Sequence, residues 1–223
     1  MDWDSVYRQQ GAFEGPPPWN IGDPQPELAS LIAAGKISGV VLDAGCGVAE
    51  LSLALAGRGY TVVGIDLTPT AIEAAGQEAQ QRGLGTASFF QADITAFDQY
   101  PPGSEGRFDT IVDSTLFHSL PVERRDGYLS SIHRAAAPGA RYYVLVFAKG
   151  AFPPEAEAKP NEVDEAELRA AVSKYWAVDE IRAAFIHATL PQVPDAPVPM
   201  PSFGLDDNGR AKMPAYLLSA HKA

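Results

Sequence analysis

Two glycines and three acids are spaced in a way that suits the binding of a nucleotide-like molecule. Residues 40–50 read Val-Val-Leu-Asp-Ala-Gly-Cys-Gly-Val-Ala-Glu, an apolar run that ends at Asp43 and is followed by Gly45 and Gly47. A strand, a tight turn and the start of a helix form the place where parallel α/β sheets bind such ligands. Glycine at both positions permits the turn and lets a ligand approach the backbone closely.

The acids around this turn indicate a ligand that carries no phosphate. A dinucleotide site needs a third glycine three residues after the second, and Glu50 occupies that position. Asp43 and Glu50 would repel a pyrophosphate, but they would attract an ammonium and a sulfonium, the two cations of S-adenosylmethionine. Asp66 ends a second apolar run and is placed to accept both ribose hydroxyls of an adenosine. The glycine pair alone could be a structural turn, whereas the full set predicts an S-adenosylmethionine site rather than an NAD site.

Length and charge limit the remaining classes of function. The chain has 223 residues and a formal net charge of −11, and we expect a single domain over residues 1–223. The acidic balance argues against a nucleic-acid substrate, because such binding depends on basic contacts to phosphate. One cysteine excludes an intramolecular disulfide, and no apolar run approaches the roughly 18 residues of a membrane span. We expect a cytoplasmic protein without a metal, a nucleic-acid partner or a membrane partner, while its oligomeric state stays open.

Apolar runs alternate with helix-forming stretches, as a doubly wound parallel α/β sheet requires. We interpret residues 1–25, which are rich in aromatic residues and proline, as an N-terminal cap. The Pro-rich apolar stretch at 190–214 is interpreted as an insertion before the last strand, either a lid over the site or a rigid surface loop. Strands are expected at 39–43, 61–66, 87–92, 108–113, 141–147, 176–189 and 216–221, and helices at 26–36, 51–56, 122–136 and 165–174, with one more starting at Pro69.

Three segments resemble a known group of enzymes. Residues 16–27, Pro-Pro-Pro-Trp-Asn-Ile-Gly-Asp-Pro-Gln-Pro-Glu, are similar to the Pro-Trp-x-x-Gly-x-Pro-x-Pro signature of thiopurine S-methyltransferase-like enzymes and of thiol or halide methyltransferases. Residues 113–123 and 168–176 look most like the heterocyclic toxin methyltransferases of mycobacteria, which methylate hydroxyquinolones and related small aromatic heterocycles. The resemblance covers most of residues 16–180 and the last strand. It implies a class I, Rossmann-like methyltransferase with a seven-stranded sheet whose last strand is antiparallel.

The resemblance also implies a role for each residue of the cofactor site. Ala49 stands at the third position of the group's glycine pattern. Asp93 could instead cap the turn that follows it, and Trp19 could serve core packing alone. The methionine portion of S-adenosylmethionine is assigned to Asp43, Gly45, Cys46 and Gly47, with Trp19 closing that end; ribose and adenine are assigned to Asp66 and Leu67, and the adenine edge to Asp93 and Ile94.

Methyl transfer to oxygen, sulfur or nitrogen requires an aligned nucleophile, and a hydroxyl also benefits from a base. His118 follows the fourth expected strand at the edge where such folds bind ligands, so it is the leading candidate for the base. Asp113, five residues earlier, could orient the imidazole or serve the cofactor. A purely structural role for His118 is the alternative. Apolar side chains suited to a substrate pocket are Phe13, Phe117, Met200 and Phe203.

Three functions are compatible with these observations. The favoured one is a methyltransferase acting on a hydroxyl, or on a sulfur or nitrogen, of a small aromatic heterocycle, with detoxification as its role. A thiol or halide methyltransferase would need no base, because its nucleophiles are soft and already reactive. A non-catalytic protein that binds the cofactor is the third. The residues do not identify the substrate or the methylated atom.

Overall fold

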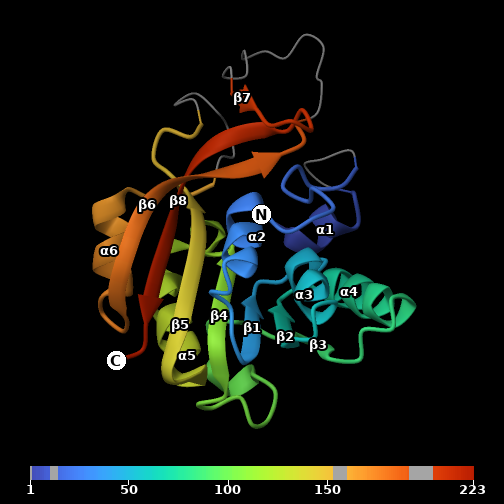
Figure 1. The fold of residues 1–223 in the computed structure, drawn as a ribbon, viewed down its shortest axis with the longest axis vertical. Helices are drawn as coiled ribbons and strands as arrows, with labels where there is room; N and C mark the ends of the chain where they lie inside the picture. Colours follow the sequence, from blue (N-terminus) through green and yellow to red (C-terminus); the bar gives the residue numbers. More distant parts are fainter. Residues whose placement is uncertain (1, 11–14, 153–159, 191–202) are drawn as a thin grey trace.

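The apolar runs of the sequence form one continuous sheet at the centre of the molecule (Figure 1). The computed structural model describes residues 2–10, 15–152, 160–190 and 203–223. The spatial order of the strands is β3-β2-β1-β4-β5-β8-β6, and β7 pairs with β8. The strands are β1 (Val40–Ala44), β2 (Thr61–Asp66), β3 (Ala87–Gln91), β4 (Phe108–Ser114), β5 (Ala136–Phe147), β6 (Ala177–Ala188), β7 (Gly204–Leu205) and β8 (Ala211–His221).

The pairing of these strands confirms the predicted fold class. β1 pairs in parallel with β2 and β4, and the parallel pairing continues to β3 on one side and to β5 on the other. The last strand, β8, lies antiparallel between β5 and β6. The strand order reverses between β1 and β4, and ligands of doubly wound sheets bind outside the carboxyl ends of the strands at such a point.

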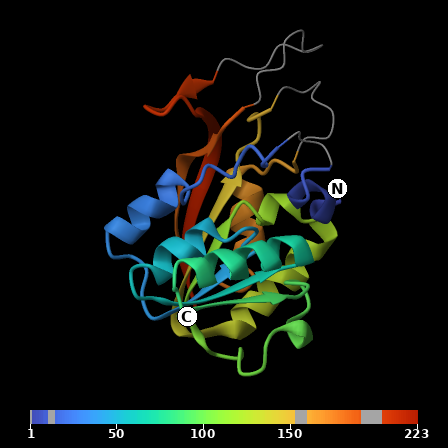
Figure 2. The same ribbon diagram turned by 90° about the vertical axis from the view of Figure 1, so that its right-hand side faces the viewer.

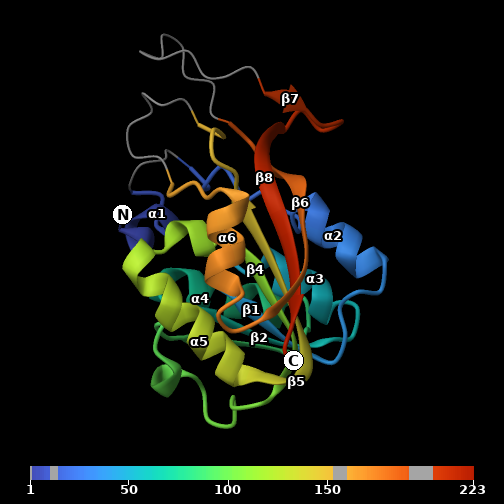
Figure 3. The same cartoon turned by 90° about the vertical axis from the view of Figure 1, so that its left-hand side faces the viewer.

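Helices cover both faces of the sheet (Figure 3). In that view, α5 and α6 lie on one side and α2 and α3 on the other, because each helix presents one apolar stripe to the sheet. α3 and α4 contact β2, while α6 contacts β6. The helices are α1 (Trp3–Tyr7), α2 (Pro26–Ala33), α3 (Glu50–Ala56), α4 (Pro69–Gln81), α5 (Arg125–Ala135) and α6 (Glu165–Val172), with short 3-10 turns η1 (Phe97–Gln99), η2 (Phe117–Ser119) and η3 (Val122–Arg124).

Two apolar layers hold the helices against the sheet. One lies beneath α5 and α6 and includes the fully buried Ile111, Tyr128 and Tyr142. The other lies beneath α2 and α3 and includes Val41 and Leu55. β1 is apolar almost throughout because both of its faces are covered, as is usual for central parallel strands. These layers fix the carboxyl ends of β1, β2 and β4 relative to one another.

The C-terminal region differs from the sequence-based expectation. The stretch expected as an insertion contains β7 and the first four residues of β8, while residues 191–202 lie outside the described residues. The sheet therefore has eight strands instead of the seven expected. Pro214, the last residue of the expected insertion, lies inside β8, where its carbonyl accepts the N–H of Ala148 just beyond the end of β5. At that place the N–H that proline lacks removes no ladder hydrogen bond.

The N-terminal helix lies near the carboxyl ends of the parallel strands (Figure 2). α1 is held to the start of α4, because the Asp4 carboxylate accepts the Thr70 N–H at 3.2 Å and Arg8 donates to the Thr70 hydroxyl at 3.2 Å. The interpretation of residues 1–25 as an N-terminal cap stays a prediction. None of the described helices is long and apolar enough to cross a membrane.

Candidate active site

Two cavities meet at the carboxyl ends of β1, β2 and β4. The larger has a volume of about 290 Å³ and the smaller of about 60 Å³. Gly45, Ser114 and Thr115 line both of them. The larger cavity also includes Trp3, Tyr7, Asp66, Leu67, Asp93, Ile94, Leu116, Ser119, Leu120 and Arg124, and the smaller one Trp19, Asp23, Gln25, Asp43, Cys46, Ala49 and Glu50.

The glycine turn is as tight as its sequence predicts. Gly45 and Gly47 have φ angles of 69° and 53°, a region that disfavours residues with a side chain. A Cβ on Gly45 would lie 2.8 Å from Leu116, and one on Gly47 would lie 2.5 Å from the Tyr7 hydroxyl oxygen. Glycine is therefore required here both by the backbone and by close neighbours. The second contact brings α1 directly onto the turn.

Asp66 organises the junction between this turn and the start of α4. Its carboxylate accepts the Gly47 N–H at 2.9 Å through one oxygen. The other oxygen accepts both the backbone N–H and the hydroxyl of Thr68, at 2.9 and 2.7 Å. Thr68 stands at the N-cap of α4, but its side chain binds Asp66 and makes no capping hydrogen bond. The carboxylate is fixed at the wall of the larger cavity, with lone-pair positions left for ligand hydroxyls.

Asp93 and Ile94 lie farther along the same cavity, after β3. The Asp93 carboxylate accepts the Thr95 N–H at 3.0 Å, which is the turn-capping alternative considered from the sequence, and it also pairs with Arg124. Partial burial acts to raise the pKa of Asp93, but the bonds from Thr95 and the Arg124 guanidinium hold it below its usual range. Asp93 is therefore an anion, and sequence reasoning missed its cationic partner.

The smaller cavity is acidic. Its lining includes the carboxyl groups of Asp23, Asp43 and Glu50, and no basic side chain is among the described residues that line it. Asp43 is 2 % exposed and accepts the Ser52 hydroxyl at 2.7 Å. Burial raises the pKa of Asp43 to about 6 and that of Glu50 to about 7. A cation bound in this cavity would supply the positive counter-charge that the described lining residues do not provide to these carboxyl groups.

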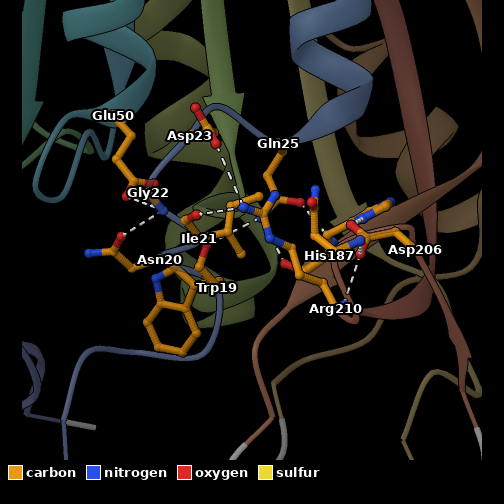
Figure 4. A network of polar contacts seen from close by, with 11 residues as sticks. Trp19, Asn20, Ile21, Gly22, Asp23, Gln25, Glu50, His187, Asp206 and Arg210 are labelled. Carbon is orange, nitrogen blue, oxygen red and sulfur yellow. Dashed lines mark hydrogen bonds and ion pairs between the residues drawn. The ribbon is translucent and has the colours of Figure 1, made fainter.

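A segment from Trp19 to Gln25 closes the smaller cavity (Figure 4). The buried Gln25 side chain accepts the His187 N–H at 2.7 Å and donates to the His187 carbonyl at 2.9 Å. It therefore pairs with β6 as the backbone of a neighbouring strand would. His187 is in turn bound to Asp206 at 2.8 Å through its Nδ1 atom.

Further bonds hold the middle of this segment from two sides (Figure 4). Arg210 donates to the Ile21 carbonyl at 3.0 Å and forms an ion pair with Asp23 at 3.6 Å. From the opposite side, the Glu50 carboxylate accepts the Gly22 N–H at 2.7 Å. The segment is thus fixed between Arg210, which directly precedes β8, and Glu50 of α3. It carries the Trp19 ring, which meets Trp3 of α1 edge-on at 6.0 Å.

This arrangement suits S-adenosylmethionine. Asp66 can accept the ribose hydroxyls in the larger cavity, and the acidic smaller cavity complements an ammonium. A family model described as a methyltransferase domain matches residues 36–188, more than half of the chain. The chain belongs to the methyltransferase domain family. Its methyl donor is S-adenosylmethionine.

Relatives of this methyltransferase agree with that assignment. The 2-heptyl-1-hydroxyquinolin-4(1H)-one methyltransferase of Mycobacteroides abscessus is 52% identical over 223 residues, which covers 99% of this chain and 96% of that protein. A probable thiol methyltransferase of Arabidopsis thaliana is 29% identical over 60% of this chain and 58% of its own length. A solved structure that concerns the conversion of a disulfide bond into a thioacetal group during echinomycin biosynthesis has a TM-score of 0.81 and 33% identity, covering 99% of this chain and 90% of that one.

His118 and Asp113 of the methyltransferase do not form the expected pair. The His118 ring is 2 % exposed and lines neither cavity, and its Nδ1 atom accepts the Phe147 N–H at 3.2 Å. Burial, with help from Arg125, lowers the pKa of His118 to about 3. Among the described residues, His118 lines neither cavity, its Nδ1 lone pair is taken by Phe147, and its low pKa makes it a weak base; its catalytic role stays a prediction. These contacts argue against the predicted base.

Asp113 is occupied by other partners. One carboxylate oxygen accepts the N–H groups of Leu116 and Phe117 at 2.7 and 3.3 Å, and the other accepts the Tyr128 hydroxyl at 2.8 Å. Burial raises the pKa of Asp113 to about 7, which these three bonds only partly offset. Asp113 therefore fixes the loop after β4, and it does not orient an imidazole.

The residues expected at a substrate pocket lie apart from one another. Phe117 is fully buried in the core beneath α5, with its ring under the Arg125 guanidinium, so it cannot wall the cavity. Phe203 is partly buried against the apolar layer beneath α2. Phe13 and Met200 lie outside the described residues. The substrate roles of Phe203, Phe13 and Met200 stay predictions.

Several lining residues were missed by sequence reasoning. Trp3 and Tyr7 come from α1, and Arg124 comes from the turn before α5. A signal existed for Tyr7, since aromatic residues are dense in the first 25 positions, but their spacing does not indicate which ring reaches the glycine turn. Ser114 and Thr115, which line both cavities, lie between Asp113 and His118 in the sequence, but no pattern predicted them as site residues.

Proposed function

We propose that this methyltransferase methylates a hydroxyl oxygen on a small aromatic heterocycle of the hydroxyquinolone kind, in a detoxification role. The observation that carries the proposal is the 52% identity to a hydroxyquinolinone methyltransferase over nearly the whole of both chains. The contacts of the site support it, because two cavities with different linings share Gly45 of the glycine turn, Ser114 and Thr115.

The side chains around these cavities have distinct tasks in the proposed reaction. Bound S-adenosylmethionine supplies an electrophilic methyl group on a positively charged sulfur. Asp66 orients the ribose, while Asp43 and Glu50 provide negative charge beside the methionine end. Trp19 and Tyr7 lie over the turn and exclude water. Alignment of the acceptor with the methyl group accounts for the main part of the rate, as intramolecular reactions of the same kind illustrate.

A methyl-transfer assay with labelled S-adenosylmethionine tests the proposal. We expect labelled product from a 1-hydroxyquinolin-4-one and little from a small thiol or a halide ion. Thiol methylation is the second candidate, favoured by the 29% identity to the Arabidopsis thaliana relative. Product from the thiol alone would support that second function. Cofactor binding without product from any acceptor would support a non-catalytic role and end the proposal.

A further inference from the structure

The point of methyl transfer can be located from the two cavities. Adenosine and methionine are joined through the sulfonium sulfur, so S-adenosylmethionine bound across both cavities would have its sulfur near the residues that line both. Gly45, Ser114 and Thr115 are the described residues common to both linings. Gly45 has no side chain. Ser114 and Thr115 therefore bring the only side-chain functional groups among the described residues that line both cavities.

Thr115 occupies this place in a strained backbone conformation. Its φ angle is 77°, and a β-branched residue with a positive φ is a genuine outlier that costs roughly 1–3 kcal/mol. Among the described residues, positive φ angles are otherwise carried by glycines, with Gln9 and Ala49 as the other exceptions. Glycine would suit position 115 better if only the backbone mattered. The threonine side chain is thus retained against a conformational cost.

Neighbouring bonds hold this conformation in place. The Thr115 N–H donates to the Leu145 carbonyl at 3.1 Å, and its own carbonyl accepts the Ser119 hydroxyl at 2.9 Å. Asp113 binds the next two N–H groups of the loop. The backbone on both sides of Thr115 is consequently fixed, and the residue is held where the two cavities meet.

The two hydroxyls have no hydrogen-bond partner among the side chains and backbone groups that the structure describes, in contrast to Ser52, Thr68, Thr95 and Ser119, which each donate to a neighbour. We propose that Thr115 and Ser114 donate hydrogen bonds to the acceptor oxygen and so select oxygen acceptors over sulfur acceptors. This inference rests on the proposed function and deepens it.

The chemistry of the step is consistent with two neutral donors. An aromatic N-hydroxyl or enol enters as its oxyanion, with its proton released to solvent. A lone pair on that oxygen forms the new O–CH₃ bond while the C–S bond breaks, and its electron pair stays on sulfur as a neutral thioether. Hydrogen bonds to the oxyanion fix its position behind the methyl carbon. Sulfur is a weaker acceptor, so a thiolate gains little from the same donors.

Substitutions at Thr115 separate the hydroxyl from the backbone strain. Thr115→Gly removes the hydroxyl and the strain of a Cβ at positive φ. Thr115→Ala removes the hydroxyl and the γ-methyl but keeps a Cβ at this φ, and Thr115→Ser loses the γ-methyl but keeps the hydroxyl. With a 1-hydroxyquinolin-4-one as acceptor, we expect kcat/KM to fall roughly 10- to 100-fold in the Gly and Ala variants, the loss expected for a hydrogen bond to a charged group. Thr115→Ser should retain most of the activity, and Ser114→Ala should lose activity in the same direction.

Two further readouts distinguish this role from a structural one. The dissociation constant for S-adenosylmethionine, measured by calorimetry, should change less than about threefold in Thr115→Gly, and thermal unfolding should show that this variant is at least as stable as the wild type. Transfer to a small thiol, where the wild type shows any, should be nearly unaffected. Equal losses with hydroxyl and thiol acceptors, or unchanged kcat/KM in Thr115→Gly and Ser114→Ala, would overturn the inference.

The wild-type assay keeps this test apart from the test of the proposed function. If the wild type methylates no hydroxylated heterocycle, the proposed function fails and the inference fails with it. If the wild type methylates the hydroxyquinolone and Thr115→Gly does so equally well, the proposed function stands and only the role of the hydroxyls is rejected.

Discussion

Ala49 occupies a position where glycine would relieve strain. It precedes α3 with a φ angle of 69°, and this left-handed conformation costs an L-residue roughly 1–2 kcal/mol. Ala49→Gly removes that strain, but it also removes a buried methyl group and adds backbone freedom to the unfolded chain, about 1–2 kcal/mol together. The two effects nearly cancel. We expect a change of less than about 0.5 kcal/mol in the free energy of unfolding, measured in urea.

Ala75 provides the matched control for this substitution. It is fully buried within α4, where the backbone is helical and a glycine relieves nothing. Ala75→Gly should therefore lose roughly 2 kcal/mol through lower helix propensity and lost burial. Equal losses at both positions would mean that the backbone at Ala49 is not strained in solution.

Asp113 should make stability depend on pH. Its pKa in the folded protein, about 7, lies above the ordinary value of 3.8. The folded state therefore holds a proton that the unfolded state releases, and the resulting stability is present below about pH 4 and lost as the pH rises through about 7. Asp113→Asn has no such proton. We expect the stability of the wild type relative to this variant to fall between pH 4 and pH 7, as measured by urea unfolding across that range. A difference that rises with pH would falsify the buried, protonated state.

At the scale of elements, Gln25 joins two segments that are far apart in the chain. Its amide makes both hydrogen bonds to the backbone of His187 and is 5 % exposed. Gln25→Ala would leave a buried N–H and a buried carbonyl without partners, each costing about 1–3 kcal/mol. We expect a loss of roughly 2–4 kcal/mol in urea unfolding. Calorimetry should also show weaker S-adenosylmethionine binding, because the segment that carries Trp19 loses its attachment to β6.

An exposed glutamine serves as the control for that variant. Gln77 lies on α4, and among the described residues its side chain bonds to Glu73, one turn earlier. Gln77→Ala should change stability by no more than about 0.5 kcal/mol and leave cofactor affinity as it is. If Gln25→Ala behaved like Gln77→Ala, the N-terminal segment would not depend on its bond to β6.

The elements also explain which parts of the site could be predicted from the sequence. Asp43, Asp66 and Asp93 each end or follow an apolar run, and parallel strands bring their carboxyl ends to one edge, so their proximity could be predicted from the pattern alone. The partners of Asp113 and His118 could not. His118 lies in the short turn η2, and the two side chains bind different partners: Tyr128 of α5 binds Asp113, and Phe147 of β5 binds His118. Such contacts depend on tertiary packing, which neither spacing nor residue type records.

Thr115 and Pro214 illustrate a second limit of sequence reasoning. A threonine with a positive φ and a proline inside a strand both contradict local preference. Each is tolerated only because of its surroundings, the fixed loop after β4 in one case and the end of β5 in the other. Rules based on residue preferences for backbone conformation do not predict such positions. Departures from these preferences are nevertheless frequent at functional sites.

At the scale of the whole molecule, the site draws on nearly every part of the chain. α1 and the Trp19–Gln25 segment cover it, and β1, β2 and β4 form its floor. His187 of β6 and Arg210, just before β8, support the cover. A ligand that fills both cavities must therefore stabilise the entire fold. At a hundredfold excess over its dissociation constant, S-adenosylmethionine should add about 2.7 kcal/mol, a shift of several degrees in Tm, whereas NAD should give none.

The carboxyl groups of the smaller cavity should make the ratio of the affinities for S-adenosylmethionine and S-adenosylhomocysteine depend on pH. S-adenosylmethionine carries a sulfonium that S-adenosylhomocysteine lacks, and Asp43 and Glu50 line the cavity beside it. Burial raises the pKa values of these groups to about 6 and about 7, so they ionise as the pH rises from 5 to 8. An opposite charge within a few ångströms stabilises the ionised carboxylates, so binding of the sulfonium releases protons below pH 7. Calorimetry should show the ratio of the two affinities shifting toward S-adenosylmethionine by roughly tenfold over this range.

The Glu50→Gln variant tests whether the pH dependence of the affinity ratio arises from the carboxyl groups of the smaller cavity. The variant keeps an oxygen that can accept the Gly22 N–H but cannot ionise, so the shift between pH 5 and pH 8 should shrink markedly. Glu73→Gln, on the exposed side of α4, changes the net charge by the same amount and should leave the shift intact. If both variants flattened the curve equally, the net charge of −11 would be acting through the general field of the protein. If neither did, the carboxyl groups would lie too far from the sulfonium, and product release would owe nothing to their charge.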